Sequence, residues 1–264
     1  MDTSTLETLA VGLLAFFAAG YFVLGGADIG TGMLTPYLGR GDAERRLVLT
    51  SFAPFFLGNE VWLVAAAGLL IGCFPALEGE LLSGQFAVVV PLLAGWAVRD
   101  AGLWLRGRTG GSRWRAGCDG AVVCGSWAVA LAWGWLLAGL FTGSAGAAAT
   151  GPVAVLTALA VAALFAAHGL GFAAMRLTGD PYARAHVLVG RGARPWQTFA
   201  LTGVLMAALP LSAGVALPLG ESAADGATLA FLVPALLGVT PLLLAVQAWM
   251  WRTFRHRVTG PSYI

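Results

Sequence analysis

The amino-acid sequence predicts an all-α integral membrane protein, a polytopic bundle of about seven transmembrane helices. Of its 264 residues, 58% are hydrophobic and only 11% are charged, against roughly 45–50% and 25% in soluble domains. Its apolar runs, such as 153–167, are apolar on all sides, whereas strands of a membrane β-barrel alternate apolar and polar residues over about ten positions. We therefore expect a single transmembrane domain that covers residues 1–264.

The expected spans follow from the thickness of the membrane. The hydrocarbon layer is roughly 30 Å thick and each helical residue rises about 1.5 Å, so a spanning helix needs about 20 apolar residues. Seven runs meet this requirement, at residues 7–27, 47–77, 84–105, 120–142, 152–175, 197–219 and 228–252.

Each run is bounded by polar or turn-forming segments. The first leads into glycines at positions 25, 26, 30 and 32, which would allow either a close approach of helices or a break in the helix. The second run is long enough to be tilted, kinked or broken. Arginine-rich segments follow the first, third, fifth and seventh runs, whereas acidic or uncharged segments follow the second, fourth and sixth.

The arginines indicate how the chain is threaded through the membrane. All 15 basic residues are arginine, and every second connection is basic. By the positive-inside rule the basic connections and the C-terminus are cytoplasmic, and the N-terminus is outside. Nucleic-acid binding would need a basic face on a soluble element, so no nucleic-acid partner is expected. The clusters are Arg40, Arg45 and Arg46; Arg106, Arg108, Arg113 and Arg115; Arg184, Arg191 and Arg194; and Arg252, Arg255 and Arg257.

Ionisable residues inside the apolar runs are candidates for function, because each costs at least about 2.5 to 3.5 kcal/mol to insert into the membrane. They are Asp28, Glu60, the adjacent Arg99 and Asp100, and His168. The threading above predicts that all except Glu60 lie in the cytoplasmic third of the membrane. Glu60 is expected deeper, about 20 Å of helix from the cytoplasmic start of the second span.

Both structural and functional interpretations of these residues are open. Arg99 could pair with either aspartate and lock helices together without transporting anything. Glu60 has only Asn59 beside it and no obvious cationic partner, so we expect it to be uncharged at rest and able to exchange a proton. For His168, a role in proton transfer and a simple hydrogen bond between helices are both open.

The cysteines and glycines indicate no metal or nucleotide site. Cys73, Cys118 and Cys124 lack the CxxC or CxxCH spacing that a zinc site or covalent haem attachment would require. A phosphate-binding loop needs a lysine after its glycines, and the chain has no lysine.

Several short motifs follow one another along the chain. They are Gly26–Leu34 (GADIGTGML), Leu38–Arg40, Glu44–Arg46, Gly58–Leu63 (GNEVWL), Arg99, His168–Gly169, Met175–Gly179 (MRLTG), Ala245–Trp249 (AVQAW) and Phe254–Val258 (FRHRV). In this order they resemble subunit II of the cytochrome bd quinol oxidases, and they cover both ends and much of the middle of the chain.

The resemblance implies a place in a respiratory complex. In that family a haem-bearing subunit I oxidises quinol and reduces dioxygen to water with haem b and haem d, while subunit II ligates no haem. This chain would then carry no catalytic, cofactor-binding or metal-binding residue of its own. It would pack against subunit I as a heterodimer in the bacterial cytoplasmic (inner) membrane. Quinol or quinone, membrane lipid and a small single-helix accessory subunit are further partners that the resemblance suggests.

The resemblance also implies that subunit II supplies part of a proton route from the cytoplasm and supports the haem region. By the family pattern Asp28 and Arg99 are structural polar positions, and together with the residues discussed above this gives two expected groups on this chain. The expected proton route contains Glu60, Asn59, Trp62 and His168, and the expected structural polar network contains Asp28, Arg99 and Asp100.

The chain departs from the family pattern in three ways. The family usually has an aspartate just before Gly-Asn and a glutamine just after it, where this chain has Leu57 and Glu60. Three residues are nearly one helical turn, so Glu60 could take over proton transfer from the missing aspartate. Gly25 stands where the family commonly has another aspartate. The chain is also shorter than typical members, so one helix is expected to be missing between His168 and Gln247.

Two other functions stay open at the level of the sequence. A standalone proton-coupled transporter or channel is favoured by the membrane carboxylates and by a helix break that Gly58 and Asn59 would allow. A purely structural membrane partner is favoured if proton transfer was lost together with the family's aspartate.

Overall fold

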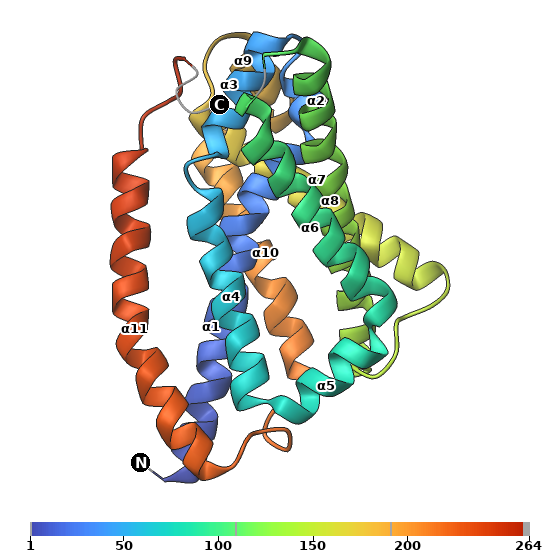
Figure 1. Cartoon of the computed structure of the whole chain (residues 1–264), viewed down its shortest axis with the longest axis vertical. Coiled ribbons are helices and arrows are strands. Elements are labelled where there is room, and N and C mark those ends of the chain that lie inside the picture. The colour runs from blue at the N-terminus through green and yellow to red at the C-terminus, as the bar shows by residue number, and fades with distance from the viewer. Residues whose placement is uncertain (1, 109, 191, 261–264) are drawn as a thin grey trace.

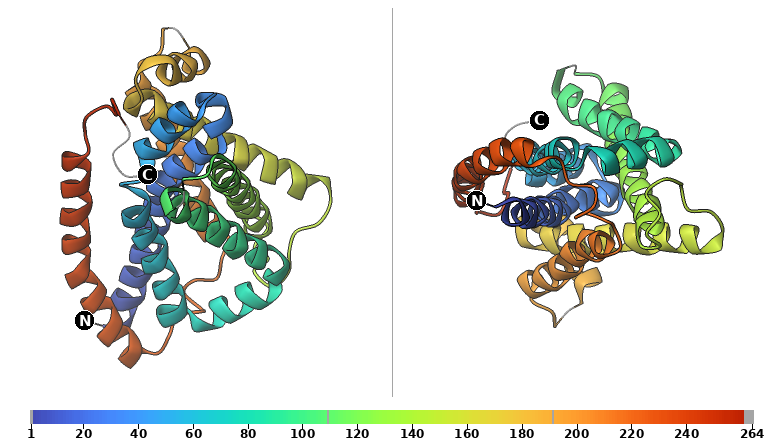
Figure 2. Two further views of the ribbon diagram at one scale, coloured as in Figure 1. Left: turned by 45° about the horizontal axis from the view of Figure 1, so that its top comes forward. Right: turned by 90° about the horizontal axis from the view of Figure 1, so that it is seen from below.

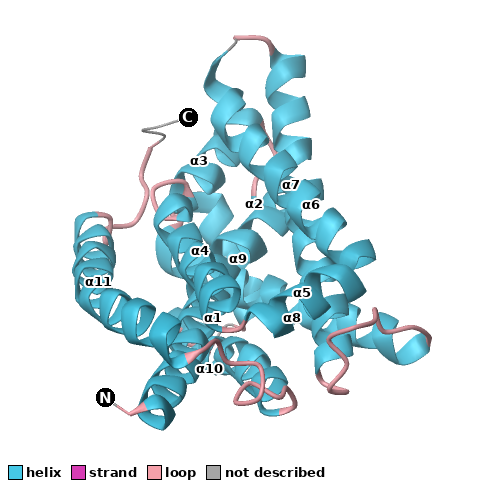
Figure 3. Ribbon diagram, turned by 60° about the horizontal axis from the view of Figure 1, so that its bottom comes forward, coloured by secondary structure: helices cyan, strands magenta, loops and turns pink. Residues whose placement is uncertain are grey.

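The computed structural model describes residues 2–108, 110–190 and 192–260, and within these ranges every regular element is a helix (Figure 3). Seven helices there are long and apolar enough to cross a membrane, as predicted. They are α1 (Thr3–Met33), α4 (Phe56–Cys73), α6 (Phe86–Leu105), α7 (Ser112–Leu140), α8 (Pro152–Arg176), α10 (Pro195–Val215) and α11 (Gly226–Thr253). The shorter helices are α2 (Thr35–Leu38), α3 (Asp42–Phe52), α5 (Pro75–Gly84), α9 (Gly179–Val189) and the 3-10 turn η1 (Arg106–Arg108).

Helix α1 is the centre of the bundle and contacts α4, α7, α8, α10 and α11 (Figures 1 and 2). In its first half the buried residues recur every three or four positions, as expected for a helix that is buried on one side only. All nine residues from 25 to 33 are buried. The polar and glycine-rich end of α1 is therefore enclosed by other helices rather than by lipid.

The glycines of this segment serve close packing, and the alternative prediction of a helix break is wrong. Helix α1 continues without interruption to Met33. A Cβ atom added at Gly30 would lie 1.9 Å from the carbonyl oxygen of Phe165 on α8, and one added at Gly169 would lie 2.2 Å from the carbonyl carbon of Gly30. Thr31 Oγ1 donates a hydrogen bond of 3.1 Å to the Gly169 carbonyl across the same contact. The backbones of α1 and α8 can meet this closely only because both residues lack a side chain.

The second predicted span is broken, as its length suggested. Helix α3 ends at Phe52 and α4 begins at Phe56, with Pro54 between them. Proline has no backbone N–H to continue the helix, and it disfavours helical geometry in the residue before it. The break expected near Gly58 and Asn59 lies just before them, at Pro54. Both residues are inside α4, where the backbone N–H of Asn59 donates to the Phe55 carbonyl.

The basic connections meet at one end of the molecule. Arg184 of α9 donates to the Leu38 carbonyl at 2.9 Å, Arg106 pairs with Asp42 at 3.0 Å, and Arg257 of the C-terminal tail donates to the Leu177 carbonyl at 2.9 Å. The N-terminus lies at the opposite end, on the side of α5 (Figure 1). This arrangement agrees with the alternation of charged connections, and the cytoplasmic location of the basic end stays a prediction. Arg191 lies outside the described residues.

Candidate functional site: a buried charge cluster

Arg99 of α6 is the centre of a charge cluster that joins three helices. Its Nη2 lies 2.8 Å from Asp28 Oδ1 on α1, and its Nη1 lies 2.8 Å from Asp100 Oδ1. The same Nη1 lies 3.5 Å from Glu60 Oε1 on α4. The side chain of Arg99 is only 1% exposed. Pairing of Arg99 with one of the two aspartates was expected from the sequence, and the structure pairs it with both.

Small residues and aromatic rings make room for this buried guanidinium group. A Cβ atom added at Gly125 of α7 would lie 2.7 Å from Arg99 Cβ, so the α6 backbone can press against α7 only at a glycine. The guanidinium carbon lies 6.0 Å from the ring centre of Phe52 and 5.8 Å from that of Phe56. Rings at this distance attract a cation through their negative faces. Arg99 Nε has no hydrogen-bond partner among the described residues.

Two expectations for Glu60 are wrong. Its carboxylate has a cationic neighbour in Arg99 and also accepts a hydrogen bond of 3.0 Å from Trp96 Nε1. It does not lie deeper than the other charges, because the break at Pro54 starts a new helix and places Glu60 in its second turn, level with Arg99. The predicted depth of Glu60 had been counted along one unbroken helix from residue 47.

The cluster has an enclosed side and an open side. The Asp28 side chain is 3% exposed, whereas those of Glu60 and Asp100 are 14% and 22% exposed. Leu57, where the resemblance expects the family's aspartate, is 50% exposed and lies one turn before Glu60. Glu60 therefore borders the outward face of α4, and Asp28 is sealed inside the bundle.

A chain of side-chain amides extends the cluster to α11. Asn59 Nδ2 donates to Asp28 Oδ2 at 3.1 Å, and Gln247 Nε2 donates to Asn59 Oδ1 at 3.1 Å. Trp62 Nε1 then donates to Gln247 Oε1 at 3.3 Å. The structure thus brings Asn59 and Trp62 into the cluster, as members linked through Gln247. Sequence reasoning missed Gln247 as a site residue, although an uncharged amide within an otherwise apolar span was an available signal.

His168 lies away from this cluster, on the side of α1 that faces α8 and α10. Its Nε2 is 2.8 Å from the Val23 carbonyl, to which it donates, and its Nδ1 is 2.8 Å from Thr202 Oγ1. Its ring stacks on Phe199 with 4.5 Å between ring centres. Among the described residues no hydrogen bond or ion pair joins His168 to Arg99 or its carboxylates. Both ring nitrogens are already engaged, so they are poorly suited to ligate a haem.

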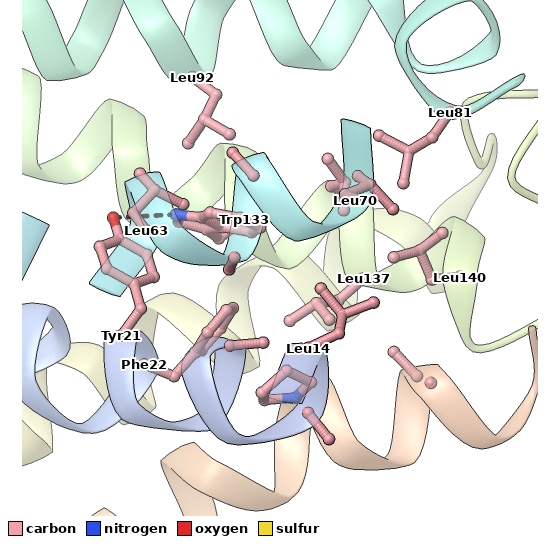
Figure 4. A pocket seen from close by; sticks show the side chains of 18 of the residues that line it. Leu14, Tyr21, Phe22, Leu63, Leu70, Leu81, Leu92, Trp133, Leu137 and Leu140 are labelled. Atoms are coloured by element: carbon pink, nitrogen blue, oxygen red, sulfur yellow. Dashed lines mark hydrogen bonds between the residues drawn. The ribbon is translucent and has the colours of Figure 1, made fainter. Parts of the chain in front are cut away.

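An apolar cavity of about 670 Å³ lies next to the charge cluster. Tyr21 and Phe22 of α1, Leu63 of α4 and Trp133 of α7 line it, and Trp133 Nε1 donates to the Tyr21 hydroxyl at 3.4 Å (Figure 4). Trp96 also lines the cavity while its Nε1 donates to Glu60. One indole therefore separates a hydrophobic chamber from the charged groups.

Comparison with known proteins places these features in a family. A sequence model of cytochrome bd terminal oxidase subunit II matches residues 6–220 of the chain. Similar proteins are the cytochrome bd-I ubiquinol oxidase subunit 2 of Escherichia coli (strain K12), 37% identical over 136 residues, and the cytochrome bd ubiquinol oxidase subunit 2 of Bacillus subtilis (strain 168), 32% identical over 192 residues. The probable cytochrome oxidase subunit 2 of Haemophilus influenzae is 30% identical over 131 residues.

These matches cover the chain and its relatives to different extents. They span 50% of this chain and 35% of the Escherichia coli protein, and 69% of this chain and 57% of the Bacillus subtilis protein. The Haemophilus match spans 50% of this chain and 35% of that protein. The family match ends before α11, so the helix that supplies Gln247 lies beyond it. Because that match covers most of the sequence, the chain belongs to the cytochrome bd terminal oxidase subunit II family.

Proposed function

We propose that this chain is the haem-free subunit of a cytochrome bd-type quinol oxidase in the bacterial cytoplasmic membrane. It packs against a haem-bearing subunit I, which carries haem b and haem d and performs quinol oxidation and oxygen reduction. Membership of the family and the names of the relatives support this assignment. The engaged nitrogens of His168 agree with haem ligation by the partner rather than by this chain.

The charge cluster has two roles in this proposal. Asp28, Arg99 and Asp100 tie α1 to α6 and so hold the shape of the subunit against its partner. Glu60 exchanges protons with the cytoplasmic side, with Asn59, Trp62 and His168 as further polar positions of the route. The observation that carries the proton-transfer role is that one guanidinium group faces three carboxyl groups, two of which are partly exposed. Uptake of a proton by a carboxyl group reduces this excess of negative charge in a medium of low dielectric constant.

The apolar cavity supports a second element of the proposal. A chamber of about 670 Å³ with leucine, tryptophan and phenylalanine walls falls in the range of small-molecule sites, and its lining suits a hydrocarbon chain. We assign it to the tail of a quinone or to a lipid acyl chain, while quinol oxidation itself occurs on the partner subunit.

Purification tests the assembly. We expect affinity purification of this chain from its own cells in mild detergent to recover a larger helical partner with haem b and haem d absorption. An organic extract of the complex is expected to contain quinone or phospholipid that stays bound through detergent washing, as the volume and apolar lining of the cavity allow. A stable, haem-free chain without a partner would favour the standalone transporter instead.

Replacing Glu60 with glutamine tests proton transfer. In the purified complex reconstituted into liposomes, we expect Glu60→Gln to slow quinol-driven proton uptake about tenfold or more, because the amide keeps the Trp96 contact but carries no exchangeable acid. Haem absorption should stay unchanged. Restoring the family pattern with Leu57→Asp in the same variant should recover uptake, since both positions border one face of α4.

Two further variants separate this effect from general damage. Glu80→Gln, an exposed carboxyl group on α5 at the opposite end of the bundle, is the matched control and should leave proton uptake unchanged. Lower uptake in His168→Gln supports the place of His168 in the route, whereas unchanged uptake limits its role to joining α1 and α10. Unchanged uptake in Glu60→Gln contradicts proton transfer and leaves the purely structural role.

A further inference from the structure

A second group of charges lies where α6 ends, about two helical turns beyond Arg99. Arg106 is 1% exposed, and its Nε donates to Asp119 Oδ1 of α7 at 2.5 Å. Its Nη2 donates to Asp42 Oδ1 at 3.0 Å, and Arg115 Nε reaches the same oxygen at 3.1 Å. Arg45 Nη1 lies 3.7 Å from Asp119. The first and third connections of the chain are therefore held together around a buried arginine.

This group forms the floor of a polar pocket of about 400 Å³. The pocket is lined by Asp42, Arg46, Arg106, Gly107, Arg108, Gly110 and Arg115. Arg46 and Arg108 are exposed, and neither guanidinium group has an acidic partner among the described residues. Asp42 and Asp119 offset two of the four lining arginines, so the pocket keeps an excess of positive charge.

The arrangement of the paired and unpaired arginines favours an anion with several oxygen acceptors. Asp42 and Asp119 accept from Arg106 and fix it in place, so the floor is rigid before any ligand arrives. Arg46 and Arg108 offer planar guanidinium groups whose parallel N–H donors match the oxygens of a phosphate. A carboxylate could bind as well, but it has fewer oxygens to share between an arginine of α3 and an arginine of η1.

The pocket lies at the level where phospholipid headgroups are found. It begins at η1, directly after the membrane-spanning part of α6. Trp104 and Trp114 beside it are 54% and 42% exposed, and the Trp114 indole donates to the Leu105 carbonyl. Exposed tryptophans mark the membrane interface. Towards the membrane centre the outward face of α6 continues with exposed apolar residues such as Val98, which acyl chains can cover.

We propose that this pocket binds the phosphate headgroup of an anionic phospholipid, with Arg46 and Arg108 as its ligands and Arg106 as its fixed floor. The lipid holds the first and third connections together from the membrane side, next to the α6 segment that carries Arg99. The site is independent of proton transfer through Glu60 and of the identity of the partner subunit.

Lipid binding to the purified full chain or its complex tests the proposal by native mass spectrometry. The probes are phosphatidylglycerol, phosphatidylcholine and inorganic phosphate. Each arginine near an anionic lipid contributes enough for about a fivefold change in affinity. We therefore expect Arg46→Gln and Arg108→Gln each to weaken phosphatidylglycerol binding about fivefold, and the double variant roughly 30-fold. Both side chains are exposed and have no ion-pair partner in the described part of the chain, so the variants should fold.

The matched control is the double variant Arg252→Gln and Arg255→Gln, which removes two exposed arginines at the same end of the molecule. It should bind phosphatidylglycerol as the parent does. Equal binding of phosphatidylglycerol and phosphatidylcholine by the parent overturns the proposal, as does unchanged binding in the Arg46 and Arg108 double variant. Displacement of phosphatidylglycerol by an equal concentration of inorganic phosphate would assign the pocket to a free anion and overturn the lipid assignment.

Discussion

Replacing Arg99 with glutamine is expected to lower the free energy of unfolding by about 3 to 5 kcal/mol, the usual cost of removing one partner of a buried ion pair. Glutamine is uncharged, so the substitution leaves Asp28 buried without its 2.8 Å cationic partner, while the hydrogen bond from Asn59 stays. The loss should be visible as a lower melting temperature in detergent and as a lower yield of the complex with the proposed haem-bearing partner. Arg99→Lys should also be impaired, because an ammonium group cannot reach Asp28 and Asp100 with the planar fork of a guanidinium group.

Three comparisons test whether loss of the buried Arg99–Asp28 ion pair causes the lower stability of Arg99→Gln. Arg113→Gln removes an exposed arginine without a described ion pair and is expected to change stability by less than about 0.5 kcal/mol. Arg99→Gln combined with Asp28→Asn removes both charges, so it should be more stable than Arg99→Gln alone. A melting temperature of Arg99→Gln equal to that of the parent would show that the cluster does not hold α1 and α6 together.

The spans could be predicted from the sequence because membrane thickness sets a length that apolar runs must reach. The exact ends could not, since helices continue beyond the apolar layer wherever polar residues find partners. Helix α7 begins at Ser112, eight residues before the expected start at 120, and its first turns carry Asp119. That aspartate is buried against Arg106, and Arg45 from the first predicted connection lies 3.7 Å from it. Only the folded chain brings Arg45 and Asp119 together.

The individual members of the charge cluster could be predicted from the sequence. Of their contacts, only the pairing of Arg99 with an aspartate could. An ionisable residue in an apolar run is conspicuous because its insertion is costly, and this singled out Asp28, Glu60 and Arg99. Glu60 was expected to lack a cation because its neighbours along α4 are uncharged, whereas its partner comes from α6. Pro54 was the signal for the depth of Glu60. A proline inside a long apolar run can end one helix and begin another, so the depth of later residues must be counted from the new start.

Helix α11 could be predicted as a membrane span, but its position at the edge of the bundle could not. It packs against α1 and α4, its Trp251 ring lies near Phe172 of α8 and Phe199 of α10, and its Gln247 adds one amide to the cluster. Figure 1 shows it along one side of the bundle, and half of its large apolar residues are exposed, among them Phe231 at 75% and Trp249 at 68%. An apolar span looks alike in the sequence whether lipid or protein surrounds it, so the peripheral place of α11 was not predictable.

Replacing Gly30 with alanine is expected to separate α1 from α8 and to destabilise the chain by about 3 kcal/mol, the upper end of the range for overpacking a core. The added Cβ would lie 1.9 Å from the Phe165 carbonyl oxygen and 2.9 Å from the Gly169 amide nitrogen. Both are backbone atoms, so no change of rotamer relieves the clash and the helices must move apart. The Thr31 bond to the Gly169 carbonyl would lengthen with them.

Gly12→Ala is the matched control, because it makes the same change in the same helix at a position where the new Cβ meets nothing within 4 Å. It should be neutral or stabilising by up to about 1 kcal/mol, from the better helix propensity of alanine. A Gly30→Ala protein that melts like Gly12→Ala would contradict the close contact. Because Asp28 lies two residues before Gly30, a displaced α1 also draws that carboxylate away from Arg99, which is 2.8 Å from it. The glycine-rich packing of α1 against α8 and the charge cluster between α1 and α6 are therefore parts of one structure, and Gly30→Ala should weaken both.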